Sequence, residues 1–121
     1  MISHTCVGTN DLPRAAAFYD ALFAVIDAKR VFENERGIGW GKPKQPAFSV
    51  MKPFDGQPAT VGNGTMVSFA VPDQATVDAL HAKALSLGGQ DEGAPGARGP
   101  KYYGAYFRDL DGNKLAAFCF G

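Results

Sequence analysis

The feature that most constrains the fold of this sequence is that its second half repeats its first half. A short apolar run at residues 2–9 is followed by Asp11 as a helix cap and by apolar residues at helical spacing, and the same order returns over residues 65–87 with Asp73 as the cap. A single offset of 62 residues, the difference between positions 4 and 66, aligns the strands, the caps and the helices. Each copy alone has too small a core to be stable, so the two copies are expected to pair.

Strands interrupted by glycine and proline follow each predicted helix. In the first half they run over residues 36–41 and 47–52, and in the second half over residues 102–108 and 114–120. We read each half as a βαβββ module, in which these ranges are two of the three strands after the helix. The predicted fold class is α+β, with the two modules edge to edge in a curved mixed sheet whose convex face carries the helices and whose concave face can hold a ligand.

The length of 121 residues suits a single domain that covers residues 1–121. Its modules are predicted at approximately residues 1–54 and 64–121, joined by a loop over residues 55–63 that is rich in glycine, proline and polar side chains. The run at residues 93–100 has no regular period, and it is predicted to be a loop over one end of the pocket.

Composition limits the classes of partner. Twelve basic residues balance 12 acidic residues, so the chain lacks the positive charge that binding to nucleic acid or to an anionic membrane surface requires. A neutral or amphipathic small molecule is the expected partner. Cys6 and Cys119 lie in apolar, strand-like segments, which predicts two buried thiols in a reducing cytoplasm. No segment has the length of a membrane span, and a cytoplasmic location is expected.

Two stretches of sequence carry a resemblance to a known family. The first is Ile2–His4 with Asn10–Leu12 ahead of an alanine-rich helix, and the second is Tyr102 and Tyr103 with Asp109–Asn113 before the last strand. With these motifs, nearly the whole chain resembles the glyoxalase, bleomycin-resistance and extradiol-dioxygenase superfamily, also called the vicinal oxygen chelate superfamily. The resemblance implies paired modules and a divalent metal, held by a histidine in the first strand, a histidine or glutamine in the equivalent strand of the second module, and a glutamate in the last strand.

The positions that the resemblance assigns to these ligands hold His4, Met66 and Ala116, and a fourth ligand of the lyase members would fall near Ser49. Only His4 carries a group suited to zinc, nickel or iron, and one imidazole does not offset the dehydration of a divalent cation. We therefore expect no metal cofactor, with His4 as the only retained ligand of the family type. The alternative is a divalent metal held by the aspartates of the 109–111 turn or by a second subunit.

Strand alternation helps to predict which side chains face the pocket. Ala116 and Phe118 share one face of the last strand, so both face the pocket if either does. His81 is expected on the solvated face of the second helix, and no catalytic residue is assigned. The predicted substrate-binding residues are His4, Trp40, Ser49, Met51, Met66, Tyr103, Ala116 and Phe118.

The first functional hypothesis is a glyoxalase-like protein with a degenerate metal site that binds a small apolar or aromatic molecule. One alternative is a metal-dependent lyase, isomerase or dioxygenase of the lactoylglutathione lyase type, and the sequence does not decide whether the chain is an enzyme. A second alternative is an antibiotic-sequestering resistance protein, which the balanced charge supports less because such relatives bind cationic drugs through acidic surfaces. A homodimer is expected from the resemblance and from the strand edges that each module leaves uncovered.

Overall fold

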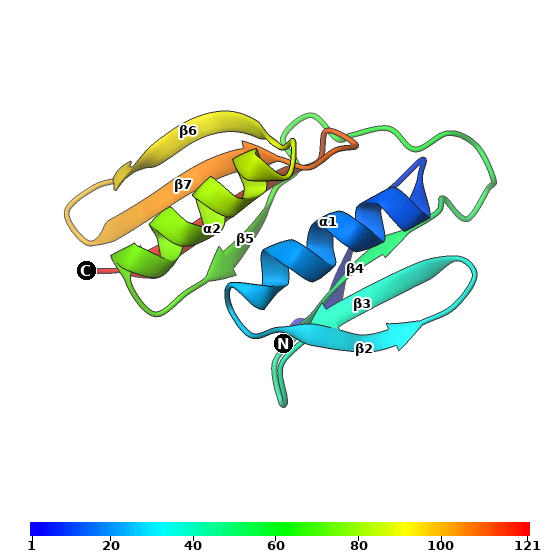
Figure 1. The fold of residues 1–121 in the computed structure, drawn as a ribbon, viewed down its shortest axis with the longest axis horizontal. Coiled ribbons are helices and arrows are strands. Elements are labelled where there is room, and N and C mark those ends of the chain that lie inside the picture. The colour runs from blue at the N-terminus through cyan, green and yellow to red at the C-terminus, as the bar shows by residue number, and fades with distance from the viewer.

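Each half of the chain folds as one strand, one helix and three further strands, as the sequence repeat predicts. The computed structural model describes residues 1–121 (Figure 1). The first module contains β1 (His4–Gly8), α1 (Leu12–Ala24), β2 (Lys29–Glu33), β3 (Gly37–Gly41) and β4 (Ala47–Met51). The second contains β5 (Val67–Ala70), α2 (Gln74–Ser86), β6 (Gln90–Ala97), β7 (Tyr102–Arg108) and β8 (Lys114–Phe120).

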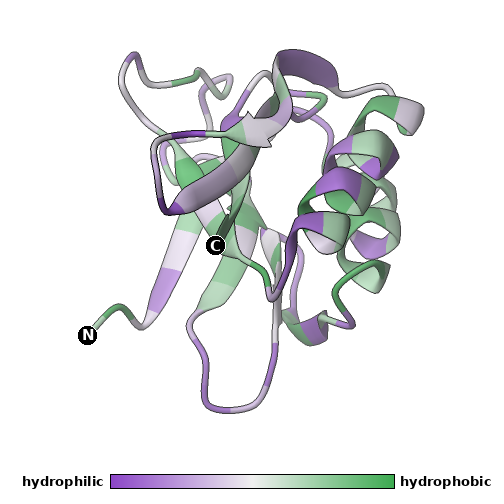
Figure 2. Ribbon diagram, turned by 90° about the vertical axis from the view of Figure 1, so that its left-hand side faces the viewer, coloured by the Kyte–Doolittle hydropathy of each residue, from purple (hydrophilic) through white to green (hydrophobic).

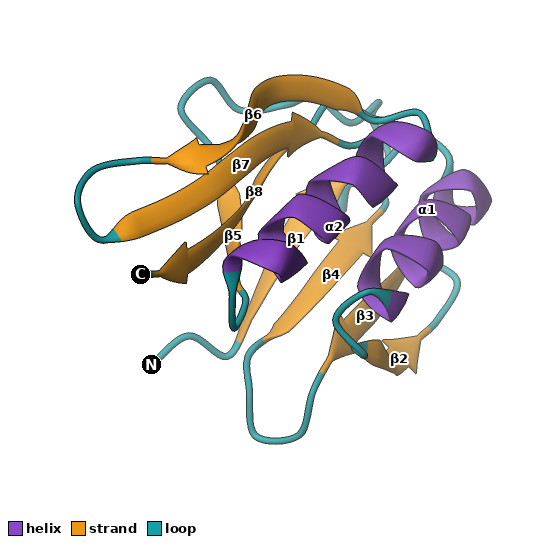
Figure 3. Ribbon diagram, turned by 60° about the vertical axis from the view of Figure 1, so that its left-hand side comes forward, coloured by secondary structure: helices purple, strands orange, loops and turns teal.

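The two modules have the same strand order. In each four-stranded sheet the first strand lies at the edge and pairs in parallel with the last strand, which gives the orders β1-β4-β3-β2 and β5-β8-β7-β6. In Figure 3 the edge strands β1 and β5 stand between the other strands of the two sheets. Both helices cover the same side of the sheets (Figures 2 and 3), which confirms the predicted fold class. Neither helix is long and apolar enough to cross a membrane.

Both predicted helix caps are present. The Asp11 carboxylate accepts a hydrogen bond from the backbone N–H of Arg14 at 3.1 Å, and Asp73 accepts one from the N–H of Thr76 at 2.8 Å. These bonds satisfy amide groups that lack a partner inside the helix. The core between helices and sheets is continuous across the modules, because Phe69 of β5 packs edge-on against Phe23 of α1 at 5.2 Å between ring centroids.

The strand β6 differs from the sequence prediction, which placed a loop over residues 93–100. Residues 90–97 pair with β7, but the pairing register shifts between Asp91 and Gly93 and again between Gly93 and Gly96. These irregularities remove the alternation by which a strand is recognised in a sequence. Pro95 is compatible with the strand because β6 lies at the edge of its sheet.

Two further predictions about single side chains are wrong. His81 is only 5% exposed, because β6 packs beside α2 and brings the Asp91 carboxylate to 3.0 Å from its Nε2. The pKa of Asp91 is lowered, first by the backbone N–H of Gly93 and then by this histidine. Of the two cysteines, Cys119 is buried as predicted, whereas Cys6 is exposed because its side of β1 does not face the helices.

The turn between β7 and β8 joins the second module to the first through a buried carboxylate. Asp109 is buried, and its Oδ1 accepts the backbone N–H groups of Asp111 and Asn113, each at 2.9 Å. Its Oδ2 accepts the side-chain amide of Asn113 and the hydroxyl of Tyr19 on α1. Burial and the neighbouring Asp109 raise the pKa of Tyr19 well above its usual value, so this hydroxyl remains a donor.

The same turn makes a second set of contacts with the end of β1. Asp111 accepts the hydroxyl of Thr9 at 2.6 Å and the backbone N–H of Asn10 at 3.0 Å. The amide of Asn113 donates to the carbonyl of Gly8 at 2.9 Å. We call the Asp109–Asn113 turn and its partners the module clamp, because its bonds to Tyr19, Gly8, Thr9 and Asn10 cross from one half of the sequence repeat to the other.

Candidate functional site

The face of the sheet opposite the helices is the first candidate site, because the resemblance places the family metal there. Phe48 and Val50 of β4 belong to the core under the helices, so the alternate residues Ser49 and Met51 lie on the other face. In β8 the core contains Leu115, Ala117 and Cys119, which leaves Ala116 and Phe118 on that same face. We call this surface the concave face.

The strand register shows how the family metal positions relate to one another. Cys6, two residues after His4, pairs with Ser49, and Ser68, two residues after Met66, pairs with Ala116. Ser49 and Ala116 are therefore equivalent positions of the two modules. The four positions thus contribute an imidazole, a hydroxyl, a thioether and a methyl group.

This set of side chains does not fit a divalent cation. His4 is exposed, and its Nδ1 lies 3.0 Å from the hydroxyl of Ser3. The Ser49 hydroxyl donates a hydrogen bond to the backbone carbonyl of Thr5 in the neighbouring strand β1 at 2.7 Å. Nowhere does the structure gather three or more His, Cys, Asp or Glu side chains that could hold a metal ion. Zinc and similar ions in proteins need about three such ligands.

Asp109 and Asp111, the alternative metal ligands that the sequence suggested, make hydrogen bonds to other groups of the chain. Both oxygens of Asp109 accept hydrogen bonds inside the module clamp. Asp111 is held by Thr9, by the N–H of Asn10 and by Arg14, whose guanidinium lies 3.5 Å away. Within one chain, neither carboxylate joins His4 in a metal site.

Glycines on the concave face make room for large apolar side chains. The ring of Phe32 in β2 lies over Gly39, and the thioether of Met51 lies over Gly37, at positions where a Cβ would overlap them. In the second module the ring of Phe118 covers Gly104 in the same way. The alternating glycines of β3 are therefore explained by packing across the sheet, and the concave face is lined by apolar groups.

A hollow of about 380 Å³ lies on this face, over the ends of β1 and β4. Cys6 and Met51 line it from the sheet, and the chain from Lys52 to Thr60 forms its far wall. Arg36 brings the charge of a guanidinium, which lies 5.2 Å from the centroid of the exposed Phe54 ring. We call this space the concave hollow. Sequence reasoning missed Cys6 because it predicted a buried thiol there, and it gave Arg36 no role at the start of a predicted strand.

Two of the predicted binding residues lie on the other side of the sheet. Trp40 is buried among the core aromatics, and its indole N–H donates to Asp20 at 2.9 Å. The hydroxyl of Tyr103 donates to Asp78 on α2 at 2.6 Å, and this bond raises its pKa. Gly39 and Gly41 flank Trp40, and Gly104 follows Tyr103, so these glycines face the concave side and both rings point towards the helices.

Comparisons with known proteins agree on one family. The model of the glyoxalase/bleomycin resistance protein/dioxygenase superfamily matches residues 1–117. A crystal structure of a glyoxalase/bleomycin resistance protein from Albidiferax ferrireducens T118 has 40% identity and a TM-score of 0.91, covering 98% of both chains. A hypothetical protein from S. aureus has 26% identity and a TM-score of 0.77, covering 98% of this chain and 91% of its own.

A lactoylglutathione lyase from Agrobacterium tumefaciens shares the fold, with 20% identity, a TM-score of 0.70 and coverage of 98% of this chain and 92% of its own. None of the curated proteins compared with the chain matches it.

Proposed function

The chain belongs to the glyoxalase/bleomycin resistance protein/dioxygenase superfamily, and we propose that within it this protein binds a small organic molecule on the concave face without a divalent metal. One observation carries the proposal: the positions that the resemblance assigns to metal ligands hold His4, Ser49, Met66 and Ala116. A face that offers one imidazole and several apolar groups favours a ligand held by burial and shape rather than by chelation.

The concave hollow indicates the chemistry of such a ligand. Cys6, Met51 and Phe54 present apolar or weakly polar surface, which suits an aromatic or aliphatic body. Arg36 uses its Nε–H to bond the carbonyl of Lys52 at 3.2 Å, and its remaining N–H donors are available to an anionic or carbonyl oxygen. The volume of about 380 Å³ is within the range of small-molecule pockets.

The first test of this proposal is the metal content of the purified, untagged protein. After incubation with zinc, nickel, manganese or iron(II) and desalting, we expect far less than one metal ion per chain by elemental analysis, because the concave face supplies one good ligand. The His4→Ala variant is expected to give the same result. Near-stoichiometric metal that His4→Ala loses would instead support a metal-dependent lyase, isomerase or dioxygenase.

The second test uses the accessible thiol of Cys6 as a reporter for the concave hollow. Cys119 is buried, so an alkylating reagent is expected to modify one thiol per folded chain, and Cys6→Ser is expected to abolish this reaction. With 8-anilinonaphthalene-1-sulfonate as an aromatic anionic probe at ten times its dissociation constant, we expect alkylation to slow about tenfold, by mass action.

A pair of charge variants makes the thiol experiment specific. Arg36→Gln is expected to weaken protection of Cys6 by the probe, because it removes one of the two cations that line the hollow, the other being Lys52. Lys101→Gln removes an exposed cation from the β6–β7 turn and is expected to leave protection unchanged. Probe binding that leaves the alkylation rate of Cys6 unaltered would place the ligand outside the concave hollow and contradict the proposal.

A further inference from the structure

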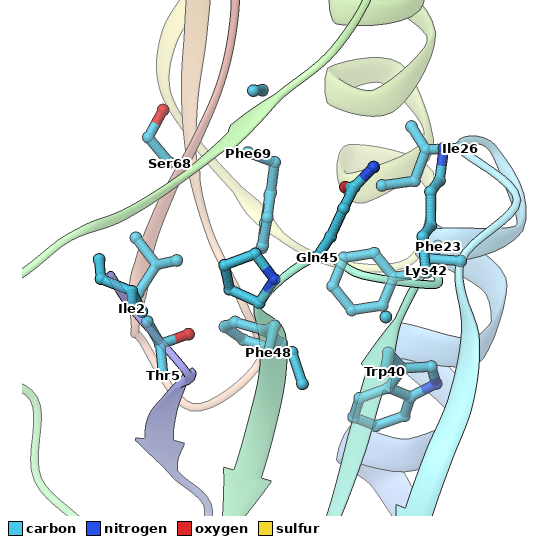
Figure 4. A pocket seen from close by; sticks show the side chains of 16 residues that line it. Ile2, Thr5, Phe23, Ile26, Trp40, Lys42, Gln45, Phe48, Ser68 and Phe69 are labelled. Atoms are coloured by element: carbon cyan, nitrogen blue, oxygen red, sulfur yellow. The ribbon is translucent and has the colours of Figure 1, made fainter.

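A second cavity lies on the helix side of the sheet, where the two modules meet (Figure 4). It has a volume of about 320 Å³ and lies between the end of α1, the β3–β4 turn and the strand β5. We call it the junction cavity. Most of its surface is apolar, and its wall includes Thr5, Phe23, Trp40, Phe48, Val67 and Phe69.

Aromatic rings from both modules form the inner wall of the junction cavity. Phe23, Phe48 and Phe69 meet edge to face, with centroids 5.2 to 5.5 Å apart. This arrangement offers ring faces and edges to a further aromatic group, which is the packing that such rings prefer. A dry protein cavity of about 150 Å³ is enough to hold benzene, so about 320 Å³ accommodates one ring with a short chain.

The polar side chains in the cavity wall are those of Thr5, Lys42, Gln45 and Ser68. Lys42 is the only charged residue in the wall, and it makes no ion pair with any carboxylate of the chain. The neighbouring Gln45 is exposed, and its side-chain amide has no hydrogen-bond partner within the chain. Figure 4 shows Lys42 and Gln45 on the same side of the cavity as Phe23. An unpaired cation beside an aromatic wall is complementary to an aromatic anion.

We propose that the junction cavity binds a small aromatic monocarboxylate, with the ring among Phe23, Phe48 and Phe69 and the carboxylate at Lys42. This site is separate from the concave hollow, because Phe48 and the concave residues Ser49 and Met51 project from opposite faces of β4. It therefore does not depend on the function proposed for the other face.

The single tryptophan of the chain provides a direct readout, because Trp40 lines the junction cavity. Titration with 3-phenylpropanoate is expected to change tryptophan fluorescence in a saturable manner. Its neutral amide, 3-phenylpropanamide, is expected to bind more weakly at low ionic strength. Lys42→Gln is expected to weaken carboxylate binding about threefold to fivefold, which is the effect of one partly exposed ion pair, and to leave amide binding unchanged.

Matched variants separate this site from unspecific binding. Lys44→Gln removes a charge from the same turn but not from the cavity wall, and it is expected to bind 3-phenylpropanoate as the wild type does. Val67→Phe places a ring in the cavity on an apolar strand position, and it is expected to abolish the fluorescence change in a folded protein. Absence of saturable binding by the wild type, equal losses in both lysine variants, or undiminished binding by Val67→Phe would each overturn the proposal.

Discussion

Replacing Asp109 by alanine is expected to destabilise the protein by about 3–5 kcal/mol, the cost of leaving several buried hydrogen-bond donors without an acceptor. Asp109 is buried and accepts four hydrogen bonds, so the change leaves the hydroxyl of Tyr19 and the amides of Asp111 and Asn113 without their acceptor. For a domain whose total stability is about 5–15 kcal/mol, this loss removes from about a fifth to all of the free energy of unfolding. Chemical denaturation followed by circular dichroism measures it.

The matched variant Asp109→Asn distinguishes the loss of hydrogen bonds from the loss of volume. An asparagine retains one carbonyl oxygen for the two backbone N–H groups of the turn, but its amide faces the side-chain amide of Asn113. We expect a smaller loss of about 1–2 kcal/mol, in line with the loss of one or two bonds. Equal stability of Asp109→Ala and the wild type would show that the module clamp does not hold the two halves together.

The fold could be predicted from the sequence because its signals are local and occur twice. Asp11 and Asp73 cap the two helices at the same offset that relates the strands, and the structure contains both caps. The strand β6 was missed because Gly93 and Pro95 belong to an irregular edge strand, where register shifts remove the alternation. The error at His81 followed from it, because a residue on a polar helix face becomes buried only when that strand covers it.

The candidate site was less predictable because it depends on contacts between distant segments. Trp40 and Tyr103 were assigned to the pocket as aromatics, but alternation along β3 and β7 directs them towards the helices. There Asp20 accepts a hydrogen bond from the indole N–H of Trp40, and Asp78 accepts one from the hydroxyl of Tyr103. Strand boundaries must be known to within one residue before alternation assigns a face. The concave hollow takes its far wall from an irregular segment, which carries no period that a sequence reveals.

Restoring the two missing protein ligands is expected to create a metal site on the concave face. The double variant Met66→His/Ala116→Glu would give the family set of two imidazoles and one carboxylate together with His4, and it is expected to retain about one zinc or nickel ion per chain after desalting. Elemental analysis measures this gain against the wild type.

The stability of the double variant provides a second readout, because Ala116 is 0% exposed. A glutamate at this position buries a carboxylate, so the metal-free variant is expected to unfold at a lower temperature than the wild type. Metal at 100 times its dissociation constant contributes about 2.7 kcal/mol, which raises Tm by about 10 °C for a domain of this size.

The His4→Ala change in the background of the double variant is the decisive control. It is expected to abolish both metal retention and the rise in Tm, because two introduced ligands alone hold a divalent cation weakly. Metal retention that does not depend on His4 would mean that the equivalent strand positions of the two modules do not converge on one site. Together with a metal-free wild type, dependence on His4 would show that the concave face preserves the geometry of a chelating site after its ligands have been replaced.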